Sequence, residues 1–107
     1  MIYLAAPYTH ADPSVREQRF QTINKVAASF FAQNLQVFSP ISHSHPIALV
    51  GDLPTDWEFW TRFCIKMLSV CDKFYVLTLD GWKESIGVQE ETKIANAFRI
   101  PIFYISP

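Results

Sequence analysis

The feature that most limits the fold of this chain is a repeated alternation of short apolar runs with longer segments of helical periodicity. The runs are almost continuous in hydrophobic residues, which is typical of strands buried on both faces of a sheet. They are predicted as strands at residues 2–5, 35–41, 73–79 and 101–105. Strands that alternate with helices form a parallel sheet covered by helices on both sides. The sequence therefore predicts an α/β protein.

The segments between the runs carry helix signals. Asp12 is the predicted N-cap of a helix that has Pro13 at its first position and ends near Asn34. Asp56 is the predicted N-cap of a second helix, and Glu91 lies in a third. The inner side of the second helix is predicted to hold Trp57, Trp60, Cys64, Met67, Leu68 and Cys71. Residues 42–56 are rich in turn formers and are predicted to be a loop. We therefore predict one domain over residues 1–107 with a flavodoxin-like three-layer α/β/α sandwich and a parallel sheet of four to five strands.

Composition narrows the class of protein. A chain of 107 residues with 50% hydrophobic residues forms one domain around one core. Its net charge is −1 and its basic residues are not clustered, so neither a nucleic acid nor a membrane is a predicted partner. No leader sequence is visible, which predicts a cytoplasmic protein. Cys64 and Cys71 lie two helical turns apart, about 10 Å, and are predicted to be reduced core thiols.

One of two neighbouring glutamates points to the apolar side of the third predicted helix. At 100° per residue, Glu91 projects among apolar residues, whereas Glu90 lies on the flank. The apolar residues of this helix are Ile86, Val88, Ile94, Ala95 and Phe98. A buried carboxylate needs a partner or a raised pKa, and such groups gather at functional sites. The alternative is a structural glutamate that bonds backbone amides or an arginine. We predict that Glu91 lies in a pocket at the carboxyl end of the sheet and that Glu90 is more exposed.

Two further groups of residues favour an anion site. Ser85 and Gly87 open the helix of Glu91, where unpaired N–H groups attract anions, although Ser85 can also act only as the N-cap. Arg16 and Arg19 project inward near the end of the first strand and can bind a phosphate or a carboxylate. Alternatively, these side chains, particularly that of Arg19, extend over the rim of the sheet and keep their charged ends in solvent. We expect Ser85, Gly87 and Arg16 to converge on a phosphate-sized space.

The remaining candidates are aromatic residues and histidines. Tyr8 follows the first strand, where its hydroxyl can bond a ligand or Glu91. Trp82 can stack on a nucleobase, whereas Trp57 and Trp60 are expected to pack in the core. His43 and His45 form an H-x-H pair, but no further ligands of suitable geometry accompany them. The sequence therefore predicts no metal site and no cofactor.

Four stretches, IYLAAPY, VFSPI, CDKFYVL and GWKESIGVQEE, together resemble the nucleoside 2-deoxyribosyltransferase-like superfamily, and most closely a small bacterial and phage branch of it. The resemblance covers nearly the whole chain, and the S-x-G-V-x-x-E pattern at 85–91 is its most specific part. It implies that Glu91 is the nucleophile on C1′ of a sugar and that Ser85 contacts the sugar or its 5′-phosphate. It also implies that Tyr8 orients Glu91. Because relatives complete their sites with residues of a neighbouring subunit, it further implies a homodimer or higher homo-oligomer.

The chain departs from the family pattern at Cys64, where relatives carry an aspartate that assists the leaving base or the sugar. A thiol does not replace a carboxylate at the same pKa. Either Asp56, Asp80 or a bound water takes that role, or the activity has been lost. The resulting expectation is an N-glycosidase or 2-deoxyribosyltransferase acting on nucleosides or their 5′-monophosphates, with a small molecule as partner. The alternatives are a nucleotide-binding module without chemistry and an interaction protein in which Glu91 pairs with Arg16.

Overall fold

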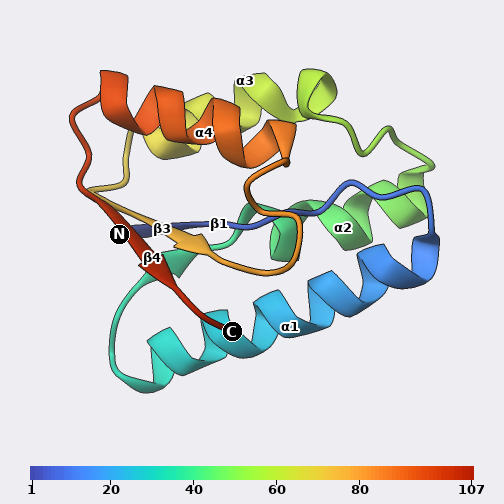
Figure 1. The fold of residues 1–107 in the computed structure, drawn as a ribbon, viewed down its shortest axis with the longest axis horizontal. Coiled ribbons are helices and arrows are strands. Elements are labelled where there is room, and N and C mark those ends of the chain that lie inside the picture. Colours follow the sequence, from blue (N-terminus) through green and yellow to red (C-terminus); the bar gives the residue numbers. More distant parts are fainter.

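The computed structural model describes residues 1–107 and contains one four-stranded sheet in which every pair of neighbours is parallel (Figure 1). The strands are β1 (Ile2–Ala5), β2 (Val37–Phe38), β3 (Lys73–Leu77) and β4 (Ile102–Ile105). Their order is β2-β1-β3-β4. This order matches the first four strands of the flavodoxin-like arrangement. The predicted parallel α/β fold is confirmed, with four strands.

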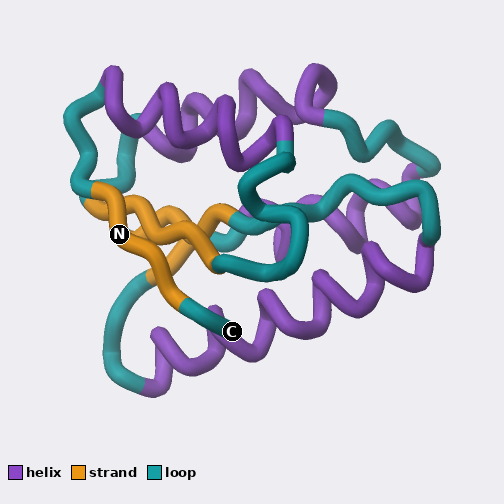
Figure 2. The backbone as a smooth tube through the Cα atoms, viewed as in Figure 1, coloured by secondary structure: helices purple, strands orange, loops and turns teal.

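Helices cover both faces of the sheet (Figures 1 and 2). Helix α1 (Pro13–Ala32) lies under one face, and α3 (Trp57–Leu68) and α4 (Ile86–Ala97) lie side by side over the other. Helix α2 (Pro40–Gly51) packs against α1 beyond the carboxyl end of the sheet. No helix of the structure combines the length and the apolar character that crossing a membrane requires.

The alternation of side chains along β1 divides the core into two layers. Tyr3 and Ala5 point to the layer of α3 and α4, whereas Ile2 and Leu4 point to the layer of α1. Tyr3 is fully buried, and its ring stacks on that of Phe74 in β3 with the ring centroids 5.6 Å apart. A polar hydroxyl is therefore held in the middle of an otherwise apolar layer.

The predicted loop at 42–56 is wrong for most of its length, because residues 40–51 form α2. Pro40 does not stop a long strand. It occupies the first turn of α2, and the hydroxyl of Ser39 caps the helix by accepting a bond from the Ser42 amide. Pro46 lies inside this helix. Because proline lacks the backbone N–H that a helix interior uses, its presence favoured the prediction of a loop. The second strand is correspondingly reduced from residues 35–41 to Val37–Phe38.

The remaining boundaries are close to the predicted ones. Asp12 caps α1 as predicted, but the Asp56 side chain makes no capping bond at α3. Cys64 and Cys71 are buried free thiols. Ile86 is 66% exposed, so the apolar face of α4 is narrower than the sequence pattern suggested.

The connections that follow β1 and β3 leave the sheet toward opposite faces, because α1 covers one face and α4 the other. Ligands of open α/β sheets bind where neighbouring connections diverge in this way. Arg19 joins the two loops by donating to the Thr9 carbonyl at 3.3 Å and to the Asp80 carbonyl at 3.1 Å. Gly81 adopts φ +90°, and a β-carbon there would lie 3.1 Å from Arg19 Nη2. The rim of the crevice is thus fixed by backbone contacts.

Candidate active site at the carboxyl edge of the sheet

A cavity of about 640 Å³ opens at this crevice. Its walls come from the segments that follow β1, β2 and β3 and from the first turns of α3 and α4. The volume lies within the range usual for small-molecule sites. The cavity is therefore the natural place to look for the predicted site residues.

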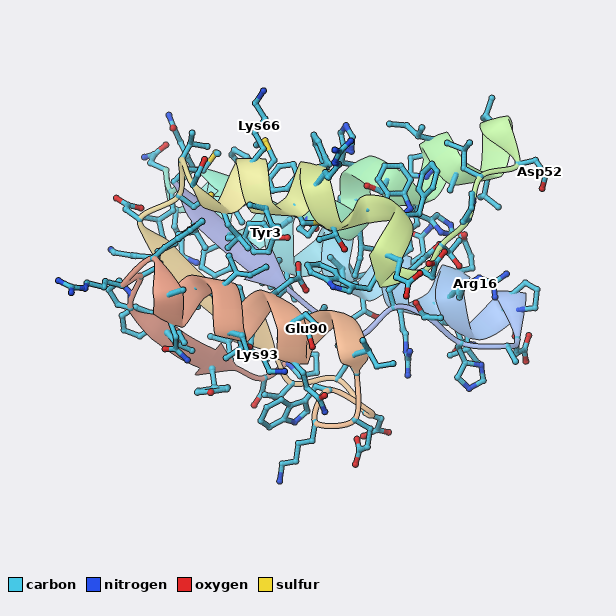
Figure 3. The ribbon with its side chains drawn as sticks, turned by 90° about the horizontal axis from the view of Figure 1, so that it is seen from above. Tyr3, Arg16, Asp52, Lys66, Glu90 and Lys93 are labelled. Carbon is cyan, nitrogen blue, oxygen red and sulfur yellow. The ribbon has the colours of Figure 1, made fainter.

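Glu91 lies in the cavity wall and is only 5% exposed. The neighbouring Glu90 has a side chain that is 39% exposed and pairs with Lys93 at 3.1 Å (Figure 3). The predicted contrast between the two glutamates is confirmed. Burial raises the pKa of Glu91 to about 8, and its hydrogen bond with Tyr3 acts in the opposite direction. The carboxyl group is thus mostly protonated at neutral pH and becomes a carboxylate as the pH rises toward and past 8.

Tyr3 is the partner of Glu91 and was missed by the sequence analysis. Its hydroxyl donates to Glu91 Oε2 across the interior of the α3–α4 layer, where Figure 3 shows it between the two helices. Tyr8, to which the resemblance assigned this task, does not bond Glu91 and bonds His45 instead. A signal for Tyr3 was available, because a tyrosine inside a buried apolar strand must find a partner for its hydroxyl.

Ser85 and Gly87 meet Glu91 at the N-terminus of α4. The Ser85 hydroxyl accepts a bond from the Val88 amide at 3.2 Å, which confirms it as the N-cap and leaves its own proton free for a ligand. A β-carbon on Gly87 would lie 3.8 Å from Ser85 Oγ and 3.9 Å from Glu91 Oε1. The serine hydroxyl and the second carboxyl oxygen therefore approach the same point beside the Gly87 backbone.

Cys64 also lines the cavity and is 5% exposed. Burial, followed by the nearby carboxyl of Glu91, raises the pKa of its thiol to about 11. Cys64 therefore stays protonated and cannot act as a carboxylate at this position. Of the two aspartates considered as substitutes, Asp56 lines the cavity and Asp80 does not.

Three predicted binding residues lie outside the cavity wall. Arg16 donates to the His10 carbonyl oxygen, and Figure 3 shows it beyond the ends of α3 and α4. Trp82 packs against Tyr104 with ring centroids 5.5 Å apart, and Asp80 bonds Arg19 through its backbone. Trp57 and Trp60, expected in the core, line the cavity while also packing on that core.

The charge of the cavity wall contradicts the expected phosphate site. The lining includes neither lysine nor arginine, so Arg16 does not join Ser85 and Gly87 there. It includes the carboxyl side chains of Asp56, Glu58, Glu84, Glu90 and Glu91. These groups do not form a cluster that could hold a metal ion. An acidic wall repels a phosphate and favours a neutral or cationic ligand.

The fold and the cavity together define a parallel α/β protein with a buried glutamate at the point where its strand connections diverge. The chain belongs to the family described as "Domain of unknown function (DUF1937)", whose model matches residues 1–106. No curated protein matches the sequence.

Proposed function

We propose that this protein is a nucleoside N-glycosidase or 2-deoxyribosyltransferase in which Glu91 is the nucleophile. One observation carries the proposal. A carboxyl group with a single tyrosine partner is buried in the wall of a nucleoside-sized cavity, at the position where the S-x-G-V-x-x-E pattern puts the nucleophile of similar enzymes. Burial without an ion pair is costly for a structural group and useful for a reactive one.

The proposed reaction has two steps. The ionised form of Glu91 attacks C1′ through an oxocarbenium-like transition state while the base departs, which leaves a glycosyl ester on the carboxyl group. Water or a second base then displaces the ester and releases Glu91. The Tyr3 hydroxyl holds Oε2, so Oε1 beside Gly87 is the oxygen that is available to attack.

Other lining residues fit the two halves of a nucleoside. The free proton of Ser85 and the amides at the start of α4 suit the sugar hydroxyls. Trp57 and Trp60 offer aromatic faces for a base. Since the wall carries carboxyl groups and no Arg or Lys, we propose an unphosphorylated nucleoside as the better substrate, rather than its 5′-monophosphate.

A binding module without chemistry is the second candidate, and the state of Cys64 supports it. The thiol cannot replace the family's aspartate because burial keeps it protonated. The interaction-protein alternative has less support, since Glu91 bonds Tyr3 and makes no ion pair with Arg16.

The test is release of free base from a panel of nucleosides and their 5′-monophosphates, followed by chromatography. The unmodified chain should release base from at least one nucleoside, and faster than from the matching monophosphate. Glu91→Gln should abolish release. Asp72→Asn removes a carboxylate that binds the chain's amino terminus outside the cavity, and it should leave release unchanged. Saturable binding without release would establish the binding module instead, and a faster reaction with the monophosphate would refute the role given to the acidic wall.

A further inference from the structure

A chain of three side chains leads from the surface of α1 to the cavity and has no part in the reaction described above. Glu17 Oε2 lies 2.7 Å from His45 Nε2, and His45 Nδ1 lies 2.5 Å from the Tyr8 hydroxyl. The three residues come from α1, from α2 and from the loop after β1. His45 is 4% exposed, and the Phe20 ring packs on it with ring centroids 4.3 Å apart. The imidazole is therefore held in one orientation between an acid and a phenol.

The partners of His45 fix where its protons lie. The Gln21 amide and His45 keep the pKa of Glu17 below its usual value, so Glu17 is a carboxylate and accepts from Nε2–H. When the imidazole is neutral, Nδ1 accepts a hydrogen bond from the Tyr8 hydroxyl. In the imidazolium, Nδ1 donates to the Tyr8 oxygen, and the phenol proton is then free to point into the cavity that Tyr8 lines. One proton on His45 thus decides whether Tyr8 is a donor toward a ligand.

The proposed function needs such a donor. A nucleobase leaves C1′ readily only when it receives a proton, and a positioned acid contributes about 10²- to 10⁴-fold. Cys64 stands where similar enzymes carry the assisting carboxyl group, and its thiol does not fill that role. Tyr8 lines the same cavity as Glu91, and its hydroxyl is hydrogen-bonded to His45.

We propose that Tyr8 is the catalytic residue that protonates the leaving base, and that His45 and Glu17 are positioning residues that resupply its proton. The inference rests on the proposed function, and it gives the protonation of the base to Tyr8 in the loop after β1, with Glu17 of α1 and His45 of α2 behind it.

Atoms and charges balance in this scheme. As the bond from Glu91 to C1′ forms and the bond from C1′ to the base breaks, the base takes the Tyr8 proton and Tyr8 takes the Nδ1 proton of the His45 imidazolium. The carboxylate of Glu91 has become an ester and the imidazolium a neutral ring. In the second step water bonds C1′ and frees Glu91, and the proton of that water returns through Tyr8 to His45.

Neighbouring charges act on Tyr8, the member of this hydrogen-bonded series that lines the cavity. Burial raises the pKa of Tyr8, and Arg16 opposes this while Glu17 adds to it. The Arg16 charge thus stabilises the phenolate that forms transiently as the proton passes. On the cavity side the facing groups are the lining carboxyls of α3, α4 and the segments before them (Asp56, Glu58, Glu84, Glu90 and Glu91).

The experiment compares two leaving groups on the same sugar, the best nucleoside of the panel and the corresponding 4-nitrophenyl glycoside, whose phenolate leaves without a proton. Tyr8→Phe should slow the nucleoside about 100-fold or more and the nitrophenyl glycoside less than about threefold. Glu17 is half-exposed. In Glu17→Gln, the rate of nucleoside cleavage should begin to fall at a lower pH than in the unmodified protein, whereas the pH profile for the nitrophenyl glycoside should stay unchanged. Asp72→Asn serves as the control variant, and circular dichroism verifies that each variant folds.

The outcomes separate the two proposals. Equal loss on both substrates in Tyr8→Phe, or an unchanged nucleoside profile in Glu17→Gln, would overturn the proton chain and leave the role of Glu91 intact. Cleavage of the nitrophenyl glycoside alone by the unmodified chain would overturn it in the same way. Cleavage of neither substrate would refute the proposed function, and the inference with it. Should Tyr8→Phe fail to fold, the profile of Glu17→Gln decides.

Discussion

At the scale of single residues, the main determinant of the site is the burial of one carboxyl group without a counter-ion. Glu91 has a hydrogen bond from Tyr3 and no cation beside it, so desolvation governs its pKa. The oxygen that Tyr3 does not hold lies beside Gly87 in the wall of the cavity, which is the arrangement that the proposed reaction needs. The cost of that burial is measurable in the absence of any substrate.

The stability of the fold should fall as pH rises, because of Glu91. Its pKa is raised from 4.5, the ordinary value of a solvated glutamate, to about 8 in the folded chain. Between these values the folded state holds a proton that the unfolded state has released, so stability declines through that window and levels off above it. Glu91→Gln should therefore match the unmodified chain near pH 4.5 and exceed it by roughly 2–4 kcal/mol at pH 8.5.

Urea unfolding at the two pH values measures this difference. A destabilised Gln variant at pH 8.5 would mean that the carboxylate is paired rather than merely buried.

At the scale of elements, the start of α4 organises the site, and its cap has an energetic role that the equivalent residue of α3 lacks. Ser85 accepts a bond from the Val88 amide, whereas Asp56 makes no capping bond. Ser85→Ala should therefore lower the free energy of unfolding by about 1 kcal/mol. Asp56→Ala should lower it by no more than about 0.5 kcal/mol, through its interaction with the helix dipole. Thermal unfolding compares the two, and equal losses would contradict the assigned caps.

How far the sequence predicts each element depends on whether its signal is local. Glu91 and Ser85 were found because helical periodicity and capping depend on neighbours within one helix. Helix α2 was missed because Pro40 and Pro46 are usual in loops, whereas the packing of this segment against α1 and its cap at Ser39 support a helix and are not visible in a local sequence pattern. Tyr3 and His45 were missed as site residues because their partners are distant in sequence: Tyr3 bonds Glu91 in α4, and His45 bonds residues of α1 and its preceding loop.

At the scale of the whole molecule, the cavity lies at the carboxyl end of the sheet, between the segments that follow β1, β2 and β3 and the first turns of α3 and α4. One of its walls comes from the first turn of α3. The outer side of this helix carries exposed apolar residues. Phe59 is 47% exposed and Ile65 is 37% exposed. The neighbour of Phe59, Trp60, lines the cavity, so a second copy docked on α3 would lie close to the site.

We expect this surface to pair two chains in an isologous dimer. Sedimentation equilibrium should give twice the 12.3 kDa mass of the chain, and Phe59→Glu should return it to the monomer, because a charge at the centre of an apolar contact is unpaired. Unmodified protein that stays monomeric at high concentration would rule out the dimer.

The central claim is that Glu91 forms a bond with the sugar, and mass spectrometry of the intact chain and its peptides tests it most directly. The chain is mixed with the nucleoside that it cleaves, and the reaction is stopped by acid during the first turnover. The predicted result is a mass increase of one glycosyl group on the peptide that contains Glu91, assigned by fragmentation to Glu91 rather than Glu90 and absent from Glu91→Gln. Free base released at the normal rate by Glu91→Gln, or a glycosyl group found on another residue, would contradict it.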